Sequence, residues 1–316
     1  MTDGGARAVG TGFPGRLAAR VAQRESQIVL GLDPDPSRLW PQGVAAGEVL
    51  ATGDRTPAER AAAAVEAHCG ALIDAAGPAC VAVKPQVACF ERLGAPGWAA
   101  LRRVAAYARD AGLLVIADAK RGDIDVTAAA YAQGLLGGLD TPFGAVDGLR
   151  ADAVTVNPYL GGDALAPFAT AAAQAGAGLF VLVRTSNPGA ADVEDLELAA
   201  GGALWEQVAR LVDGLGRDHD GAEPLSAIGA VMGATRPEHL ARARELLPRA
   251  PFLLPGIGAQ GGRVEDLAPA FVPGRAGGLV TASRSIACAH EAGGDDPATA
   301  ARREAERLRA AAWALV

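Results

Sequence analysis

Three charged side chains follow one another closely at the end of an apolar segment. Residues 113–116 are apolar and predict a buried strand, and Asp118, Lys120 and Asp123 come directly after it. Because side chains alternate between the two faces of a strand, Asp118 and Lys120 should point to the same side. Charges beside a buried strand are costly unless they pair. The cluster therefore predicts either a structural ion pair ahead of the next helix or an active site.

Polar residues also end the other apolar segments of the chain. We predict strands at 27–32, 80–83, 113–116, 153–156, 179–183, 228–232, 252–254 and 278–280, nearly all separated by helical segments, among them 57–75, 96–111, 123–133 and 297–316. This alternation predicts an α/β protein with an eight-fold (β/α)8 TIM barrel, and an open doubly wound sheet is the alternative.

The domain organisation follows from the same pattern. We expect a single barrel domain over residues 1–316, with a short amphipathic helix at about 13–24 before the first strand. The segment 36–56 is expected to be a long connection. The Gly- and Pro-rich stretch 136–148 is expected to be a loop.

In such a barrel the carboxyl ends of the strands meet at one mouth, where the active site lies. The residues predicted to gather there are Asp33, Lys84, Asp118, Lys120, Asn157, Ser186, Thr235, Gln260, Ser283 and Arg284. Asn157 and Thr235 fit a turn or cap as well as they fit a site. Two lysines, several carboxylates and an arginine at one mouth are harder to explain as turns, and they predict a functional site.

Two segments near the end of the chain predict a phosphate site. The glycine-rich stretch 256–262 allows backbone N–H groups to approach an anion closely. Arg284, which begins the segment after the last strand, can offer a fork of donors to phosphate oxygens. The loops after the seventh and eighth strands are the usual phosphate site of these barrels.

Composition narrows the choice of partners and location. A formal net charge of −7 argues against a nucleic acid or an anionic membrane, so phosphate recognition must be local. No apolar run is long enough for a membrane span, and residues 1–15 lack the apolar stretch of a signal peptide, so we expect a cytoplasmic protein. The four cysteines have no metal-binding spacing, and we expect buried thiols and no metal.

The charges at 118–123 suit a decarboxylation. Carboxylates on both sides of Lys120 make its ammonium a ready proton donor. Asp118 should repel a substrate carboxylate placed beside it, and the carbanion left by the loss of CO2 can accept the proton of Lys120. We expect the fixed charges of a site that excludes water to provide most of the rate acceleration. Asp33 and Lys84 are placed to bind hydroxyl groups, such as those of a ribose.

The same residues resemble a known family. Asp118, Lys120, Asp123, Ile124 and Thr127 form a pattern similar to the D-x-K-x-x-D-I signature, with its following Thr, of the orotidine 5′-phosphate decarboxylases. The segments 31–35, 186–189, 255–262 and 283–286, together with Lys84, also resemble that family, so the matches run from about residue 27 to 286. The GLDPDP form and the extended loops resemble its longer bacterial (type 2) subgroup.

The resemblance implies a carboxy-lyase that converts orotidine 5′-monophosphate to UMP and CO2, the last step of pyrimidine nucleotide synthesis, with no cofactor and no metal. It implies that Lys120 donates the proton to C6, that Asp118 lies beside the leaving CO2 and that Lys84 bridges the charges and the ribose. The implied substrate contacts are Asp33 to the ribose, Ser186 to the pyrimidine, and Gln260 and Arg284 to the phosphate, with Gly258 and Ser283 as further binding residues. In this family Asp123 and Thr127 reach into the neighbouring subunit's site, which implies a homodimer.

Two other functions stay open. A related barrel enzyme, a sugar-phosphate decarboxylase or aldolase, uses Mg²⁺ to stabilise an enediolate and shares a similar D-x-K-x-x-D run. In this chain the charge of Lys84 would compete with such a metal. A non-catalytic nucleotide-phosphate binding protein would need Gln260 and Arg284 but would have no need of Lys120.

Overall fold

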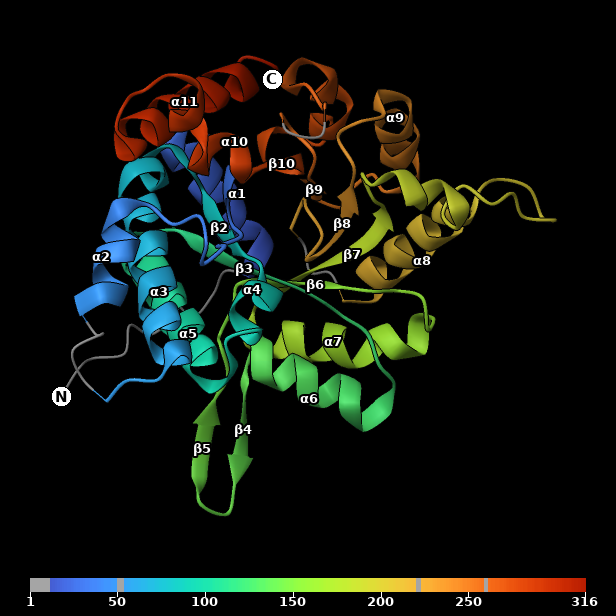
Figure 1. Cartoon of the computed structure of the whole chain (residues 1–316). Coiled ribbons are helices and arrows are strands. Elements are labelled where there is room, and N and C mark those ends of the chain that lie inside the picture. Colours follow the sequence, from blue (N-terminus) through green and yellow to red (C-terminus); the bar gives the residue numbers. More distant parts are fainter. Residues whose placement is uncertain (1–11, 50–53, 220–222, 259–260) are drawn as a thin grey trace.

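Eight parallel strands form a closed barrel within the part of the chain that the structure, a computed structural model, describes: residues 12–49, 54–219, 223–258 and 261–316 (Figure 1). The barrel strands are β1 (Ile28–Leu32), β2 (Ala82–Pro85), β3 (Leu114–Arg121), β6 (Ala153–Val156), β7 (Gly178–Arg184), β8 (Ile228–Met232), β9 (Phe252–Leu254) and β10 (Gly278–Ala282). Because β1 pairs with both β2 and β10, the sheet has no open edge there. The predicted barrel is confirmed, and the doubly wound sheet is wrong.

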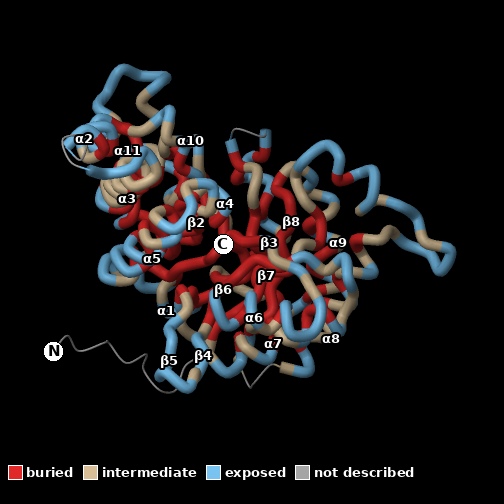
Figure 2. Tube along the Cα trace, turned by 60° about the horizontal axis from the view of Figure 1, so that its bottom comes forward, coloured by how far each residue is buried: buried red, intermediate tan, exposed pale blue. Residues whose placement is uncertain are grey.

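Helices follow most of the strands and cover the outside of the barrel. They are α3 (Pro57–Ala76), α4 (Val87–Glu91), α5 (Gly94–Asp110), α6 (Asp125–Leu135), α7 (Gly162–Ala175), α8 (Leu204–His219), α9 (Pro237–Leu246), α10 (Arg284–Ala287) and α11 (Pro297–Trp313), with short 3₁₀ segments that include η4 (Val264–Phe271) after β9. Figure 2 shows buried residues along the strands and exposed residues on the outer segments. Among the described residues no helix is long and apolar enough to cross a membrane.

Helix α3 shows how local sequence sets an element's boundary. Thr56 precedes it with its side chain accepting a hydrogen bond from the Glu59 amide, while the Glu59 carboxylate accepts one from the Thr56 amide. Pro57 occupies the first turn, where no amide partner is needed. The helix therefore begins at the predicted residue.

Helix α1 (Phe13–Arg24) closes one end of the barrel. Its buried Phe13, Leu17 and Val21 pack in one cluster with barrel residues that include Ile116 and Phe180. The Phe13 ring meets the Phe180 ring edge-on at 6.0 Å, close to the start of β7. The amino-terminal end of the barrel is thus filled with apolar side chains, and polar chemistry is left to the opposite end.

Several boundaries differ from the sequence-based prediction. β3 extends to Arg121, so Asp118 and Lys120 lie within the strand and the next helix begins at Asp125 rather than at 123. The connection 36–56 contains α2 (Pro41–Val49). The supposed loop at 136–148 contains an antiparallel hairpin, β4 (Gly138–Thr141) and β5 (Gly144–Asp147), which projects from the barrel (Figure 1). Its strands are short and exposed on both faces, so no alternation of apolar and polar residues marks them.

Candidate active site

Four charged side chains from neighbouring strands meet at the carboxyl end of the barrel. Lys84 Nζ on β2 donates to Asp118 Oδ2 on β3 at 2.6 Å and lies 3.9 Å from Asp33 Oδ1, just past β1. Lys120 Nζ donates to the other oxygen of Asp118, Oδ1, at 2.5 Å. We call Asp33, Lys84, Asp118 and Lys120 the charge array, because acid and base alternate along it. The structure thus brings together the side chains of residues 84, 118 and 120, as predicted.

Burial and pairing set the charges of the two central members. Lys84 and Asp118 are buried, whereas the Lys120 side chain is 44% exposed. Burial by itself raises the pKa of Asp118, but Lys84 and Lys120 outweigh it and lower that pKa to about 2. Burial likewise acts to lower the pKa of Lys84, and Asp118 and Asp33 outweigh it, so the net shift is upward. Both side chains are therefore charged at neutral pH.

Two further side chains hold Asp118, and the sequence-based reasoning missed both. Gln86 Nε2 donates to Asp118 Oδ2 at 3.2 Å, and Thr155 Oγ1 on β6 donates to Asp118 Oδ1 at 2.8 Å. Gln86 could have been found, because it follows Lys84 at the same strand end. Thr155 is the only polar residue of an otherwise apolar strand. The one sequence signal is its position two residues after the inward-facing Ala153, which places both side chains on the same face of the strand.

Lys120 is held in an unusual backbone conformation. Its φ is +49°, in the left-handed region that non-glycine residues rarely adopt. The pairing of β3 with β6 shifts register between Ala117 and Arg121, and within this stretch the Lys120 amide donates to Thr155 Oγ1 at 3.0 Å. Such conformations persist only where the surroundings enforce them, and they occur most often at functional sites.

The structure places Asp123 and Thr127 apart from the charge array. The Asp123 carboxylate accepts a hydrogen bond from the neighbouring Ile124 amide at 2.8 Å, and within the described chain no hydrogen bond or ion pair joins Asp123 to Lys120. Thr127 lies in the first turn of α6 and is exposed. The alternation of charges therefore runs from Asp118 towards Lys84 and Asp33, and not towards Asp123 as the sequence suggested.

The predicted phosphate residues lie around the ends of β9 and β10. Arg284 is exposed in the first turn of α10, directly after Ser283. Gly258 has a φ of +74°, and a side chain there would come within 3.2 Å of Ser285 Cβ, so only glycine fits comfortably. Gln260 lies outside the described residues.

The remaining predicted mouth residues follow β6, β7 and β8. Ser186 lies beside Gly233 after β8, where an added Cβ would meet the Ser186 amide nitrogen at 3.0 Å. Asn157 Oδ1 accepts a hydrogen bond from the Tyr159 amide at 2.9 Å, which is the bonding of a turn residue. Thr235 is half-buried beyond β8.

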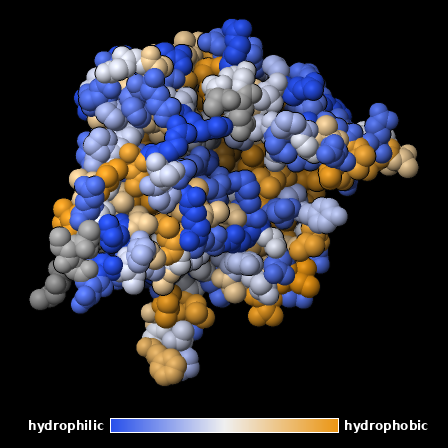
Figure 3. Space-filling model, in the orientation of Figure 1, coloured by the Kyte–Doolittle hydropathy of each residue, from blue (hydrophilic) through white to orange (hydrophobic). Residues whose placement is uncertain are grey.

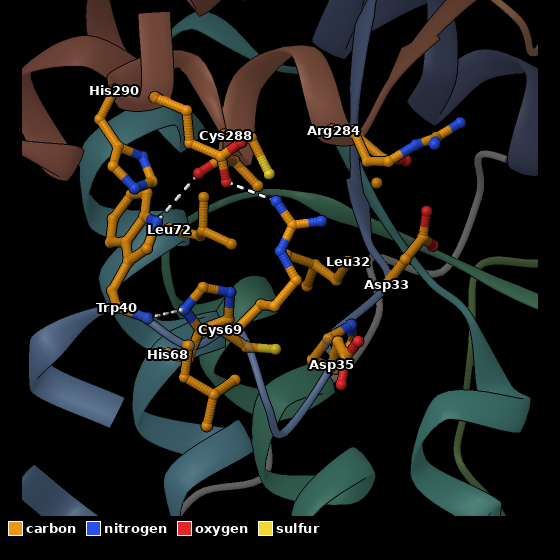
Figure 4. A pocket seen from close by; sticks show the side chains of 17 residues that line it. Leu32, Asp33, Asp35, Trp40, His68, Cys69, Leu72, Arg284, Cys288 and His290 are labelled. Atoms are coloured by element: carbon orange, nitrogen blue, oxygen red, sulfur yellow. Dashed lines mark hydrogen bonds and ion pairs between the residues drawn. The ribbon is translucent and has the colours of Figure 1, made fainter. Parts of the chain in front are cut away.

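A cavity of about 450 Å³ is lined by Asp33, the only member of the charge array that reaches it among the described residues (Figure 4). Asp33 and Arg284 lie on one side of it, and Trp40, His68 and His290 lie on the other. The Trp40 amide donates to His68 Nδ1 at 3.1 Å, and burial, with a smaller effect of His290, lowers the pKa of His68 to about 4. His68 is therefore neutral at physiological pH and serves as an acceptor.

The four cysteines are free thiols, and the expected burial holds for two of them. Cys69 and Cys80 are buried, while Cys89 and Cys288 are half-buried. Burial raises the pKa of the Cys80 thiol to about 12 and also raises that of Cys69. Among the described residues no group of three or more His, Cys, Asp or Glu side chains is arranged to hold a metal ion.

The chain is similar to known proteins over most of its length. Residues 26–303 match the model of the orotidine 5′-phosphate decarboxylase / HUMPS family. A protein named orotidine 5′-phosphate decarboxylase from Deinococcus radiodurans is 47% identical over 216 residues, which is 68% of this chain and 74% of that protein. One of the same name from Rhodopirellula baltica is 39% identical over 282 residues, 88% of this chain and 89% of the other.

A solved structure shows the same similarity in its fold. Leishmania donovani OMP decarboxylase is 32% identical and superposes with a TM-score of 0.68, covering 96% of this chain and 99% of that one. The family match, the relatives and the shared barrel all point the same way. This chain is a member of the orotidine 5′-phosphate decarboxylase / HUMPS family.

Proposed function

We propose that this chain decarboxylates orotidine 5′-monophosphate to UMP and CO2 and needs no cofactor. The observation that carries the proposal is the charge array, in which a buried, ionised Asp118 is bonded to two lysines. Relatives named orotidine 5′-phosphate decarboxylase, at 39% and 47% identity, support it. They do not favour the Mg²⁺-dependent sugar-phosphate enzyme.

The array can carry out both halves of the reaction. Asp118 stays ionised at neutral pH and repels the substrate carboxylate placed beside it. As the C–C bond breaks, CO2 leaves and the electron pair stays on C6 of the ring. The Lys120 ammonium then gives a proton to C6 and, being partly exposed, regains one from water. Lys84, fixed between Asp33 and Asp118, keeps the array ordered without solvent reorganisation.

The substrate contacts are proposed from the order of the strand ends. Asp33 and Lys84 hold the ribose, and Ser186 contacts the pyrimidine. The phosphate binds at the far side of the mouth, at Gly258, Gln260, Ser283 and Arg284. The exposed Arg284 supports this assignment, because its guanidinium is free to turn towards an incoming anion.

We also propose a homodimer in which Asp123 and Thr127 complete the partner's site. Their position outside the charge array of their own chain supports this. Half of the large apolar side chains that are exposed in the described chain fall within residues 124–160, and surfaces of this kind commonly mark interfaces. They are Ile124, Val126, Tyr131, Leu139, Phe143, Val146, Tyr159 and Leu160, and Figure 3 shows apolar surface along the projecting hairpin.

Three further assignments, on domain organisation, subgroup and cellular location, complete the proposal. The chain is a single barrel domain over residues 1–316, because the family match spans residues 26–303 without a break. It belongs to the longer bacterial subgroup, supported by the GLDPDP strand end and by the long segments 36–56 and 136–150 between predicted elements. It works in the cytoplasm, where pyrimidine nucleotides are made.

One spectrophotometric assay tests the reaction. The purified chain is mixed with orotidine 5′-monophosphate, and the loss of substrate absorbance is followed with and without EDTA. We expect conversion to UMP at the same rate in both samples. Activity that disappears after full chelation and returns with Mg²⁺ would favour the sugar-phosphate enzyme instead. Tight binding of UMP with no turnover would indicate a nucleotide-binding protein.

A further inference from the structure

One hydroxyl group connects the main chain of Lys120 to the side chain of Asp118. Thr155 Oγ1 accepts a hydrogen bond from the Lys120 amide at 3.0 Å and donates one to Asp118 Oδ1 at 2.8 Å. Lys120 Nζ donates to the same Asp118 oxygen at 2.5 Å. The three residues form a closed ring of contacts in which Lys120 is held at both its backbone and its amine. Thr155 is 1% exposed, so water has little access to replace its hydroxyl.

The ring lies where the barrel ladder is irregular. Between Ala117 and Arg121 the pairing of β3 with β6 changes register, and Lys120 adopts its left-handed φ of +49° there. A residue in that conformation is out of step with regular strand pairing, and its amide needs another acceptor. Thr155 supplies the acceptor from the neighbouring strand, so its hydroxyl favours the conformation that turns the Lys120 amine towards Asp118.

We propose that Thr155 is a positioning residue for proton transfer: its hydroxyl fixes the Lys120 amine against Asp118. This deepens the proposed function and rests on it. Thr155 acts through the two charged residues, which is why it escapes a search for charged or nucleophilic groups. Its role requires one donor and one acceptor at a single atom, which a hydroxyl provides and a methyl group does not.

Two substitutions separate this role from simple packing. Thr155→Val keeps the shape of the side chain and removes the hydroxyl. Thr155→Ser keeps the hydroxyl and removes a methyl group. If the hydroxyl positions Lys120, the valine variant should lose about 100-fold in kcat, the size of effect expected when a reacting group is misplaced by about 1 Å, and the serine variant should stay near wild type. A packing role predicts the opposite order.

The split between kcat and KM adds a second readout. Among the described residues, Thr155 has no direct hydrogen bond to a residue assigned to the ribose or the phosphate, and it reaches Lys84 only through Asp118, so KM should change less than kcat. Thr281→Val is a matched control, because Thr281 is a buried barrel threonine whose hydroxyl has no hydrogen-bond partner among the described residues. It should leave kcat unchanged. A valine variant of residue 155 with wild-type kcat overturns the proposal.

The test also works if a variant is unstable or if the proposed reaction is wrong. Should Thr155→Val fail to fold, Thr155→Ala and Thr155→Ser form a second pair, both lacking the methyl group and differing only in the hydroxyl. A wild-type chain with no decarboxylase activity defeats the proposed function but leaves the geometry testable. A crystal structure of Thr155→Val should show Lys120 out of the left-handed region or its amine displaced from Asp118, and unchanged geometry there overturns the inference.

Discussion

Asp118 is the residue on which the other side chains of the mouth converge. Its two oxygens accept hydrogen bonds from Lys84, Lys120, Gln86 and Thr155. A buried carboxylate with this many donors is stable as the anion, and removing one donor leaves part of its charge uncompensated. Single substitutions around Asp118 should therefore disturb the whole array and not only one contact.

Removing the amine of Lys120 tests the proton donor directly. Lys120→Ala should lower the rate of CO2 release by up to about 10⁴-fold, because it removes the proposed proton donor. UMP should still bind, since its ribose and phosphate contacts lie elsewhere. Release of CO2 from carboxyl-labelled substrate gives the rate, and titration calorimetry gives the affinity for UMP.

Lys120→Arg is the matched control for charge. A guanidinium keeps the positive charge beside Asp118 but holds its proton too tightly to donate it at neutral pH. This variant should bind UMP and remain almost inactive. A rate near wild type in either variant would remove Lys120 from the role of donor.

At the scale of elements, strand ends were predictable and the irregular pieces were not. The bounds of β6, β8 and β9 agree with the apolar runs, because buried parallel strands must be apolar and end where polar residues begin. The sequence-based prediction ends β3 too early, because the charges of Asp118 and Lys120 are typical of the residues that follow a buried strand. Both residues stay in the strand because Lys120 pairs with Asp118, and Lys84 and Thr155 on the adjacent strands also donate hydrogen bonds to Asp118. These contacts join separate segments, so the sequence of one segment cannot reveal them.

Contact between β1 and β10 depends on a glycine. A Cβ at Gly31 would lie 1.8 Å from Ser283 Oγ and 2.8 Å from Ser283 Cβ. Gly31→Ala should therefore push β10 away, destabilise the fold by about 1–3 kcal/mol and raise KM through the displaced Ser283 and Arg284. Urea unfolding and steady-state kinetics measure the two effects.

A second glycine supplies the control for Gly31. In the middle of α3, a Cβ at Gly70 meets only Tyr107 Cε1, at 4.0 Å. Gly70→Ala should stabilise the protein by up to about 1 kcal/mol through helix propensity, with kinetics unchanged. Equal effects of the two substitutions would show that the contact with Ser283 is not tight.

The contact between His68 on α3 and Trp40, just ahead of α2, should make the stability of the protein depend on pH. Burial, with a smaller effect of His290, lowers the pKa of His68 from 6.5 to about 4, so the unfolded chain takes up this proton more readily than the folded one. The stability from His68 is fully present above about pH 6.5 and is lost as the pH falls towards about 4. Between about pH 7 and about pH 5 the loss should be about 2 kcal/mol.

Urea unfolding at the two pH values measures this loss. His68→Gln, which cannot take up the proton, should show a pH dependence that is smaller by the same amount. Protonation of His68 also ends its hydrogen bond from the Trp40 amide, so the fluorescence of Trp40 should report the same transition. Identical pH profiles for the two proteins would mean that His68 titrates normally in the folded state.

For the whole molecule, one end of the barrel is closed and the other is open. Helix α1 fills the amino-terminal end with Phe13, Leu17 and Val21, and the charge array occupies the carboxyl end. The sequence could predict this polarity, because the strand ends carry the charges. It could not predict the hairpin, or whether copies of the chain assemble, since these depend on surfaces and not on the pattern of buried residues.

Mixing two inactive variants tests whether the sites are shared. In the proposed homodimer, Lys120 and Asp123 of one site come from different chains. Lys120→Ala and Asp123→Ala should each be inactive alone, whereas unfolding and refolding them together should form mixed dimers with one intact site each. Random pairing predicts about one quarter of wild-type activity. No recovery, with mixed dimers confirmed by mass spectrometry, would place Asp123 in the site of its own chain or outside any site.

The alternation of acid and base along Asp33, Lys84, Asp118 and Lys120 means that these four charges sum to zero. As a unit they offer a distant anion little attraction, so salt should affect capture mainly through Arg284. At close range the same four charges distinguish positions only a few ångströms apart, opposing a negative group beside Asp118 and favouring it beside Lys120. A tight inhibitor should therefore carry a negative charge at the position of C6, beside Lys120, and should place no charged group at the position that CO2 leaves, beside Asp118.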